Sequence, residues 1–387
     1  MEVIFETSKE LSKMGVQVHV FTPFEDSKVI DNVFIHKIPS MASNFGFERR
    51  FYSLMRKFYS SPFIVKNLLL RKKTIESAVS SLVKNLLPRL KEFDLDILQG
   101  EQEIPAMACI SIGKKLDIPV VAHIRNFWPE ECVDTGLIKR NISTYQVLHQ
   151  MVGHIVYEAD IVFTVSNYAR QFLKKEYGVN ENKIVEIPRG ARSFLANVDY
   201  TQKEPSAVYS GSISPHENLS LFIKSMPLVH RKVKNCSFYI TGKGNYIPKL
   251  KRIAKQCSAN VRFLWFPKKT DLQSFLSQCS VGVIPWANTI SRQFGFPIKM
   301  LNYLSVGLPV VITDVGEWSN LVKNERLGVV VKPTPESLAN GIIELLCAPT
   351  VARECGERGM RLIKERYNWE NSAKVIYNEY SKMCYGP

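Results

Sequence analysis

The most chemically suggestive stretch is residues 294–316, FGFPIKMLNYLSVGLPVVITDVG, where lysine, glycine and proline stand close together. Its first part predicts a tight loop through Phe296 and Pro297 that opens a helix, which Gly307 ends. Free backbone N–H groups at a helix N-terminus favour an anion, and Lys299 adds a positive charge. A diphosphate suits this arrangement, although the pattern also fits an ordinary loop, helix and buried strand of any α/β domain.

Polar residues also follow two other predicted strands. Arg125 and Asn126 follow the strand IPVVAHI, and Gly242 and Lys243 follow the strand CSFYIT. In parallel α/β sheets, ligands bind at the carboxyl ends of the strands, so these residues are candidates for binding. The glycine pattern is too short for a dinucleotide fingerprint and no acidic residue follows at the required place, which argues against an NAD enzyme. His123, on the strand itself, fits a packed histidine better than a catalytic base.

Strands and helices alternate regularly from Asp94 onward, in two series. Such alternation predicts α/β architecture with two doubly wound, Rossmann-like parallel sheets. Residues 188–206 have no periodicity and carry proline near both ends, which is typical of a linker. The sequence therefore predicts an N-terminal domain over 1–187 and a C-terminal domain over 207–367, followed by a terminal helix over 368–387.

Composition bounds the class of protein. The 387 residues have 45% hydrophobic and 22% charged content, ordinary values for a folded chain with two domains. No apolar run approaches the ~20 residues of a membrane span. The eight cysteines lie far apart, so neither a disulfide framework nor a zinc site is expected and the chain is interpreted as cytoplasmic, without metal or cofactor.

Positive charge is concentrated in the second half. The net charge is +15, and residues 191–387 hold 26 Lys and Arg against 14 Asp and Glu. A basic domain suits a nucleotide diphosphate or an anionic surface. Nucleic acid is the less favoured partner, since no motif of a nucleic-acid-binding fold is present.

Residues 47–73 form a basic and aromatic segment, with eight basic residues against one acidic residue. Such a composition can lie in a membrane interface or contact an anionic lipid headgroup. An amphipathic helix pair with a solvated basic face is the alternative. The first interpretation would place the protein peripherally at the inner face of a membrane.

The stretch NYLSVGLPVV, from Asn302 to Val311, resembles the donor-binding motif Glu-Tyr/Ala-Met/Leu-Ala-x-Gly-x-Pro-Val-Val of retaining GT-B glycosyltransferases of family four, the group 1 glycosyl transferases. Pro297-Ile298-Lys299 resembles the subgroup that assembles bacterial and archaeal surface polysaccharides. The likeness covers nearly the whole chain. It implies two Rossmann-like domains facing across a cleft, with the last helix returning to the first domain.

The resemblance also implies roles for single residues. The turn GSISPHEN resembles a Gly-Arg-x-x-x-x-Lys-Gly loop whose cations neutralise the donor diphosphate, with Ser212 and Glu217 at the cation positions. Many members carry two glutamates where Phe294 and Asn302 stand here, which leaves Glu317 as the candidate carboxylate. The stretch RNFWPEE, residues 125–131, is predicted as a loop and resembles the Arg-Asp-x-Trp-Pro-Glu stretch of the subgroup. The candidate catalytic residues are Arg125, Asn126 and Glu317, and the candidate donor-binding residues are Gly211, Ser212, Gly242, Lys243, Phe296, Pro297, Lys299 and Asn302.

The N-terminus departs from the family pattern. The chain begins with a predicted helix over residues 2–14, whereas the resembling family has a strand and a glycine-rich loop before such a helix. We therefore expect a misplaced start or a truncation, with the central strand of the first sheet missing from this sequence.

The resemblance implies metal-independent transfer of a sugar, with retention, from a nucleotide sugar to a glycan or lipid-linked acceptor of surface polysaccharide or glycolipid synthesis. The replaced acidic and cationic pairs keep a second hypothesis open, a non-catalytic relative that binds a sugar or a partner transferase. A third is a nucleotide-sugar epimerase of the same architecture, which would need an acid/base set.

Overall fold

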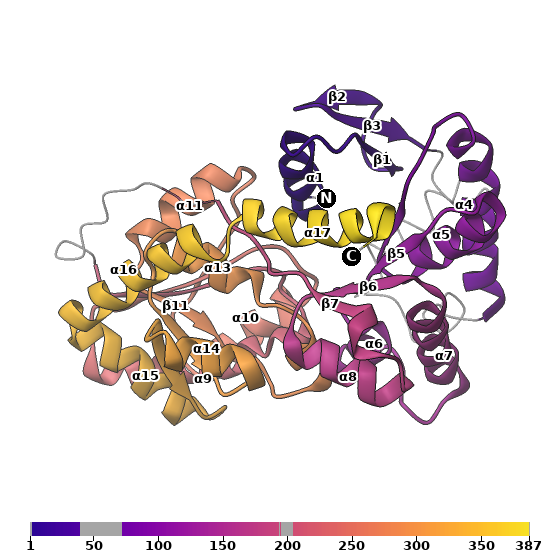
Figure 1. Cartoon of the computed structure of the whole chain (residues 1–387). Helices are drawn as coiled ribbons and strands as arrows, with labels where there is room; N and C mark the ends of the chain where they lie inside the picture. The colour runs from indigo at the N-terminus through magenta and orange to yellow at the C-terminus, as the bar shows by residue number, and fades with distance from the viewer. Residues whose placement is uncertain (1, 39–71, 193, 195–203, 387) are drawn as a thin grey trace. The chain divides into compact units, whose positions relative to one another are not determined.

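The computed structural model describes residues 2–38, 72–192, 194 and 204–386 (Figure 1). The chain divides into two compact units. Unit 1 consists of Met1–Pro188 together with Trp369–Pro387, and unit 2 consists of Arg189–Asn368. Most of the basic and aromatic segment 47–73 lies outside the described residues. Among the helices that the structure describes, none is both long and apolar enough to cross a membrane.

Unit 1 contains strands separated by helices. Its described helices are α1 (Glu2–Lys13), α4 (Lys72–Leu90), α5 (Glu103–Leu116), α6 (Trp128–Asp134), α7 (Ser143–Glu158), α8 (Asn167–Tyr177), the 3₁₀ turn η2 (Glu181–Lys183) and α17 (Trp369–Tyr385). Its described strands are β1 (Val18–Thr22), β2 (Lys28–Ile30), β3 (Val33–Lys37), β4 (Leu98–Glu101), β5 (Val120–His123), β6 (Ile161–Thr164) and β7 (Ile184–Glu186).

These strands form two sheets. β4, β5, β6 and β7 form a parallel sheet in that order, with Leu98 opposite Val120 and Val121 opposite Ile161. β1, β3 and β2 form a separate three-stranded sheet in which β2 runs antiparallel to β3. All four residues of β5 are buried, as expected for an inner strand that helices cover on both faces.

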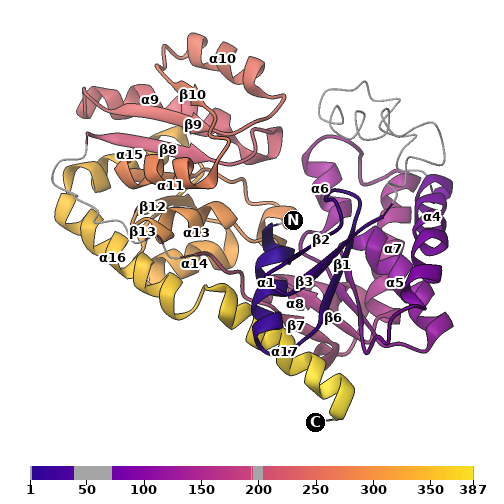
Figure 2. The same cartoon turned by 90° about the horizontal axis from the view of Figure 1, so that it is seen from above.

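The C-terminal helix α17 belongs to unit 1. Ala373 and Ile376 share an apolar cluster with Leu11 of α1 and with Phe163 of β6. The Tyr380 hydroxyl donates a hydrogen bond of 2.6 Å to Oε1 of Gln99 on β4. Figures 1 and 2 both show α17 beside α1. The last helix therefore contributes to the core of the unit in which the chain begins.

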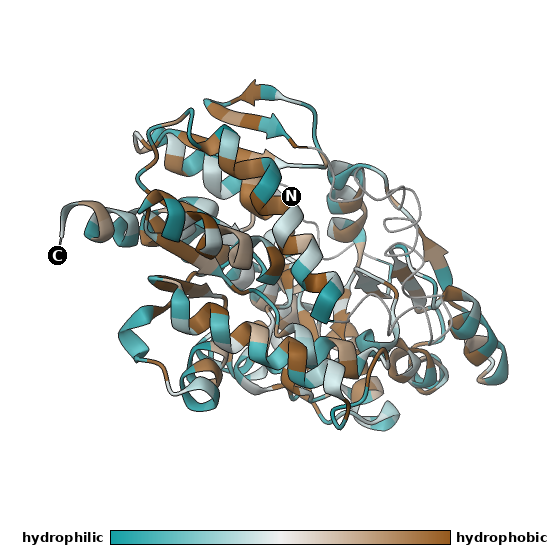
Figure 3. Cartoon of the chain, turned by 90° about the vertical axis from the view of Figure 1, so that its right-hand side faces the viewer, coloured by the Kyte–Doolittle hydropathy of each residue, from teal (hydrophilic) through white to brown (hydrophobic). Residues whose placement is uncertain are grey.

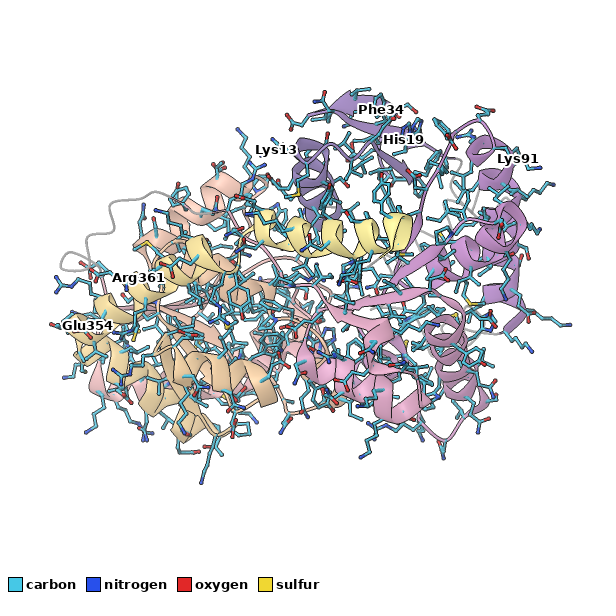
Figure 4. All side chains as sticks on the ribbon, viewed as in Figure 1. Lys13, His19, Phe34, Lys91, Glu354 and Arg361 are labelled. Carbon is cyan, nitrogen blue, oxygen red and sulfur yellow. The ribbon has the colours of Figure 1, made fainter. Side chains whose placement is uncertain are left out.

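Aromatic rings pack across β1 and β3. His19 stacks on Phe34 with ring centroids 4.8 Å apart (Figure 4), and its Nδ1 lies 2.9 Å from Nε2 of His36. Burial lowers the pKa of His19, and the nearby His36 lowers it further. Both effects favour the uncharged imidazole of His19. This neutral ring stacks on Phe34 and on His36 as an aromatic side chain.

Unit 2 repeats the same alternation. Its helices are η3 (Pro215–Glu217), α9 (Leu219–Lys232), α10 (Ile247–Gln256), α11 (Lys269–Gln278), α12 (Ile290–Phe294), α13 (Ile298–Ser305), α14 (Gly316–Asn324), α15 (Pro335–Cys347) and α16 (Pro349–Glu365). Its strands are β8 (Ser206–Ser210), β9 (Ser237–Thr241), β10 (Arg262–Leu264), β11 (Val281–Ile284), β12 (Val310–Thr313) and β13 (Gly328–Val331).

The strands of unit 2 form one parallel sheet in the order β10-β9-β8-β11-β12-β13. β8, β11 and β12 are buried along their whole length. Figure 3, in which the right-hand side of Figure 1 faces the viewer, shows helices of the chain with brown, apolar residues and teal, polar residues on different sides, as expected for helices with one buried face. α13 packs closely because Gly282 of β11 has no side chain: a Cβ there would lie 2.5 Å from the Tyr303 ring.

Candidate anion-binding site

The strand order of unit 2 reverses between β8 and β11, its two central neighbours. Chain segments that leave such a pair of strands diverge, which opens a crevice at their carboxyl ends, the usual ligand position in open α/β sheets. The segments at this point are 211–218, after β8, and 285–297, after β11. Both contain predicted donor-binding residues.

Glycine allows the turns after β8 and β9 to touch through their backbones. Gly211 and Gly242 have φ angles of +152° and +140°. A Cβ on Gly242 would lie 1.8 Å from the carbonyl oxygen of Gly211, which no side chain tolerates. The Gly211 N–H donates to the Thr241 carbonyl at 3.0 Å, and the Ile213 N–H to the Lys243 carbonyl at 2.9 Å. The structure thus brings together the predicted residues Gly211, Gly242 and Lys243.

Glu217 is the centre of a buried polar cluster and is 3% exposed. Its Oε2 accepts hydrogen bonds from Lys299 Nζ at 2.6 Å and from Trp286 Nε1 at 2.8 Å. Its Oε1 accepts from Ser212 Oγ at 3.3 Å and lies 3.5 Å from NH1 of Arg292. We call these five residues, Ser212, Glu217, Trp286, Arg292 and Lys299, the Glu217 cluster.

The charges in this cluster follow from burial and pairing. Burial alone would raise the pKa of Glu217, but the Lys299 and Arg292 cations hold it well below its usual range. Burial lowers the pKa of Lys299, and the Glu217 carboxylate opposes that effect. Burial, helped by the Arg292 charge, lowers the pKa of the adjacent His216 to about 3, so this imidazole is neutral at pH 7. The cluster therefore holds one carboxylate against two cations.

Lys299 is enclosed beneath the turn after β8. Its Cε lies 3.0 Å from the position that a Cβ on Gly211 would take, and its Nζ lies 5.1 and 4.7 Å from the ring centroids of Tyr209 and Trp286. Lys243, by contrast, places its Nζ 3.9 Å from the ring centroid of Trp265, which is 51% exposed. The two predicted lysines thus have different surroundings, one inside the cluster and the other on an exposed ring.

The remaining predicted residues of unit 2 lie around α13 and α14. The Phe296 ring packs 4.4 Å from the Trp318 ring, centroid to centroid, and Pro297 immediately precedes α13. Asn302 is half-buried on α13. Glu317 lies in the first turn of α14, after β12, where a carboxylate also suits the helix dipole. The Phe296 ring therefore has a packing role within unit 2.

Arg125 and Asn126 follow β5 in unit 1, at the carboxyl edge of its parallel sheet. Arg125 Nε lies 3.5 Å from Glu101 Oε2, and His123 Nδ1 lies 3.0 Å from Glu101 Oε1. Burial would raise the pKa of Glu101, but His123 and Arg125 lower it to about 2. His123 is 4% exposed and hydrogen-bonded, as a packed histidine should be. The segment that was predicted as a loop becomes helical at Trp128, because Pro129 suits the first turn of a helix.

Sequence reasoning missed four functional candidates. In unit 2 these are His216, Trp286 and Arg292. In unit 1, Glu103 is 5% exposed at the start of α5, and burial together with Glu131 raises its pKa to about 7. Trp286, Arg292 and Glu103 all follow the carboxyl end of a strand of a parallel sheet, so the rule that selected Arg125 and Lys243 could have found them.

Solved structures of two glycosyltransferases share this fold. Sucrose-phosphate synthase from Thermosynechococcus elongatus superposes with a TM-score of 0.73 at 15% identity, covering 98% of this chain and 92% of that one. WaaG, a glycosyltransferase involved in lipopolysaccharide biosynthesis, superposes with a TM-score of 0.68 at 13% identity, covering 100% of this chain and 96% of that one. The two α/β units therefore define a protein of the GT-B class.

Sequence comparison gives the family. Residues 2–192 match Glycosyltransferase Family 4, and residues 204–348 match Glycosyl transferases group 1. The chain belongs to this group 1, family 4 of glycosyltransferases, as its motifs predicted.

Two curated relatives illustrate the family. A glycosyltransferase of Methanocaldococcus jannaschii is 25% identical over 61% of this chain and 63% of the relative. The GDP-mannose-dependent monoacylated alpha-(1-6)-phosphatidylinositol monomannoside mannosyltransferase of Corynebacterium glutamicum is 24% identical over 59% of this chain and 64% of the relative. The chain thus matches somewhat less than two thirds of the length of these relatives.

Proposed function

We propose that the protein transfers a sugar, with retention and without a metal, from a nucleotide-diphosphate sugar to a glycan or lipid-linked acceptor in surface polysaccharide or glycolipid synthesis. Its membership of the family supports this proposal, as do relatives whose names specify GDP-mannose and kanosamine transfer. The observation that carries it is the Glu217 cluster: two cations against one carboxylate, at the strand-order reversal of unit 2, beside a glycine turn.

In this proposal unit 2 holds the donor. The turn of Gly211, Ser212, Gly242 and Lys243 lies against the diphosphate, and the net positive charge of the Glu217 cluster stabilises the negative charge that grows on the diphosphate as the sugar departs. Preorganised charge that stabilises a leaving group usually contributes more to such catalysis than any other single effect. The start of α13, from Phe296 and Pro297 to Lys299 and Asn302, forms the other side of the donor site.

Arg125 and Asn126 of unit 1 are proposed to contact the acceptor or the transferred sugar, and Glu317 of unit 2 to hold the donor sugar. Glu101 places a countercharge 3.5 Å from Arg125 Nε, and the Gln102 side chain accepts from the Arg125 backbone N–H at 3.2 Å. The second contact holds the Arg125 backbone before a substrate arrives, which lowers the entropy lost on binding.

The test is a titration of the full chain with UDP, GDP and ADP, followed by measurement of nucleoside diphosphate release from the matching nucleotide sugars. Micromolar binding of one nucleotide and acceptor-dependent release are expected. Binding without release would favour the non-catalytic relative, for which the replacement of two expected cations by Ser212 and Glu217 is the supporting observation. Conversion of the nucleotide sugar to its epimer would favour the third hypothesis, whereas a folded protein that binds no nucleotide would refute a donor site.

We also propose that segment 47–73 brings the protein to the inner face of a membrane, on the strength of its eight basic residues and aromatic side chains. Each basic residue near an anionic surface contributes ~1 kcal/mol. Sedimentation with vesicles should show binding that requires anionic lipid and weakens when Arg49, Arg50, Arg56 and Lys57 become glutamine. Equal binding to neutral vesicles, or none to either, would contradict this role.

A further inference from the structure

Arg292 stands out within the Glu217 cluster because its bonding is incomplete. It lies on α12, between β11 and α13, with its guanidinium carbon 4.9 Å from the centroid of the Trp286 ring. Its NH1 approaches Glu217 Oε1 only to 3.5 Å. Its Nε–H is buried and finds no acceptor among the residues that the structure describes. Buried N–H groups of this kind normally have a partner, so a missing acceptor needs an explanation.

Lys299 already satisfies the charge of Glu217. The 2.6 Å contact from Lys299 Nζ and the 2.8 Å contact from Trp286 Nε1 both go to Oε2, so that oxygen carries two strong donors. His216 is neutral and adds no charge. One positive charge is therefore left over, and the more weakly held cation is Arg292.

We propose that Arg292 is the residue that binds a phosphate group of the nucleoside diphosphate, while Lys299 is a positioning residue that neutralises Glu217. This inference rests on the proposed donor site and names its anion-binding residue. A guanidinium presents several N–H donors in a fixed fork that matches phosphate oxygens. The Arg292 side chain is 12% exposed, so a ligand can reach part of it, although its Nε–H is buried.

The assignment differs from what the sequence suggests, because Lys299 stands in the recognisable motif and Arg292 does not. Removing either cation from the wild-type cluster abolishes its excess positive charge. The single variants R292Q and K299M should therefore both bind nucleotides more weakly. The double variant E217Q/K299M separates the two roles. It removes the internal pair and leaves Arg292 as the only charge of the cluster, so nucleotide binding should survive if Arg292 holds the phosphate.

The experiment is calorimetric titration of UDP, GDP, ADP and pyrophosphate into the wild-type chain and into R292Q, K299M, E217Q/K299M and R361Q. Arg361 is an exposed residue of α16 (Figure 4), so R361Q makes the same charge change on the same unit away from the cluster. Thermal unfolding of each variant shows whether it is folded.

R292Q and K299M should each bind about 10- to 100-fold more weakly, as expected for the loss of a charge-assisted contact. R361Q should stay within about threefold of wild type, and E217Q/K299M should regain most of the affinity that K299M loses. Tight binding by R292Q, or loss of binding in a folded E217Q/K299M, would overturn the assignment while leaving the donor site in place. If R292Q does not fold, the double variant decides alone. If the wild type binds none of the four probes, the donor site and the assignment fall together.

Discussion

Replacing Lys299 by methionine should strongly destabilise unit 2. The substitution keeps most of the side-chain volume but removes the cation 2.6 Å from Glu217, which is 3% exposed. A buried carboxylate that loses its partner costs ~3–5 kcal/mol. Arg292 at 3.5 Å offsets part of that cost, so we expect the lower end of the range.

For a unit of this size, each kcal/mol shifts the midpoint of thermal unfolding by ~2–4 °C, so K299M should lower it by ~6–12 °C. E217Q/K299M should recover most of the loss, because replacing a buried ion pair by neutral groups is often neutral or stabilising. Differential scanning calorimetry of the three full chains is the assay. A K299M midpoint within about 2 °C of the wild type, or a double variant less stable than K299M, would refute the ion-pair reasoning.

The pH dependence of the same variants provides an independent check. Glu217 has a depressed pKa in the folded state, so its stabilising contribution is present above its ordinary value of 4.5 and is lost as the pH falls below it. The wild type should therefore lose stability between about pH 5 and pH 3 more steeply than E217Q/K299M does. Equal slopes would indicate that the carboxylate is not stabilised by its partners.

Three further predictions concern single residues. Gly242→Ala should cost several kcal/mol and abolish nucleotide binding, since its Cβ would meet the Gly211 carbonyl oxygen, whereas Gly178→Ala, with open space around it, should cost only ~1 kcal/mol. Glu103 has a raised pKa of about 7, so its contribution to stability is complete below pH 4.5 and is lost as the pH rises through 7. Between pH 5 and pH 8 the wild type should therefore lose up to ~3 kcal/mol of its free energy of unfolding in denaturant titrations, and Glu103→Gln should lose less. Arg125→Ala should reduce sugar transfer at least tenfold while leaving nucleotide affinity unchanged, and a parallel loss of affinity would contradict its assignment to the acceptor.

Local patterns were sufficient to predict most of the regular elements. The residues from Val310 to Ile312 are apolar because strand β12 is buried on both faces, and that run can be recognised without any knowledge of its neighbours. The short strands β2 and β3 were not identified, since three to five residues with mixed exposure give too little periodicity. The helical start at Trp128 was missed because proline was interpreted as a loop signal rather than as a residue of the first helical turn.

Local sequence patterns could not predict the Glu217 cluster, because its residues are far apart in the sequence. Glu217 and Lys299 are 82 positions apart and meet only because β8 and β11 are neighbours in the sheet. From the sequence alone, Glu217 stands where a cation is expected and predicts weaker diphosphate binding. Sequence spacing cannot show that a second residue cancels its charge.

The charges around Glu217 decide whether this carboxylate weakens the binding of an anion. An acid at a phosphate site opposes binding only if its charge faces the ligand, and this carboxylate turns toward Lys299 and Trp286 within the protein. The cluster as a whole remains positive, because Arg292 adds a second cation. An anion near it should therefore meet attraction rather than repulsion, screened less than at the surface because the charges are buried. The replacement of a cation by Glu217 is thus no argument against a donor site as long as Arg292 is present, and R292Q is the variant that should convert the cluster from attractive to neutral.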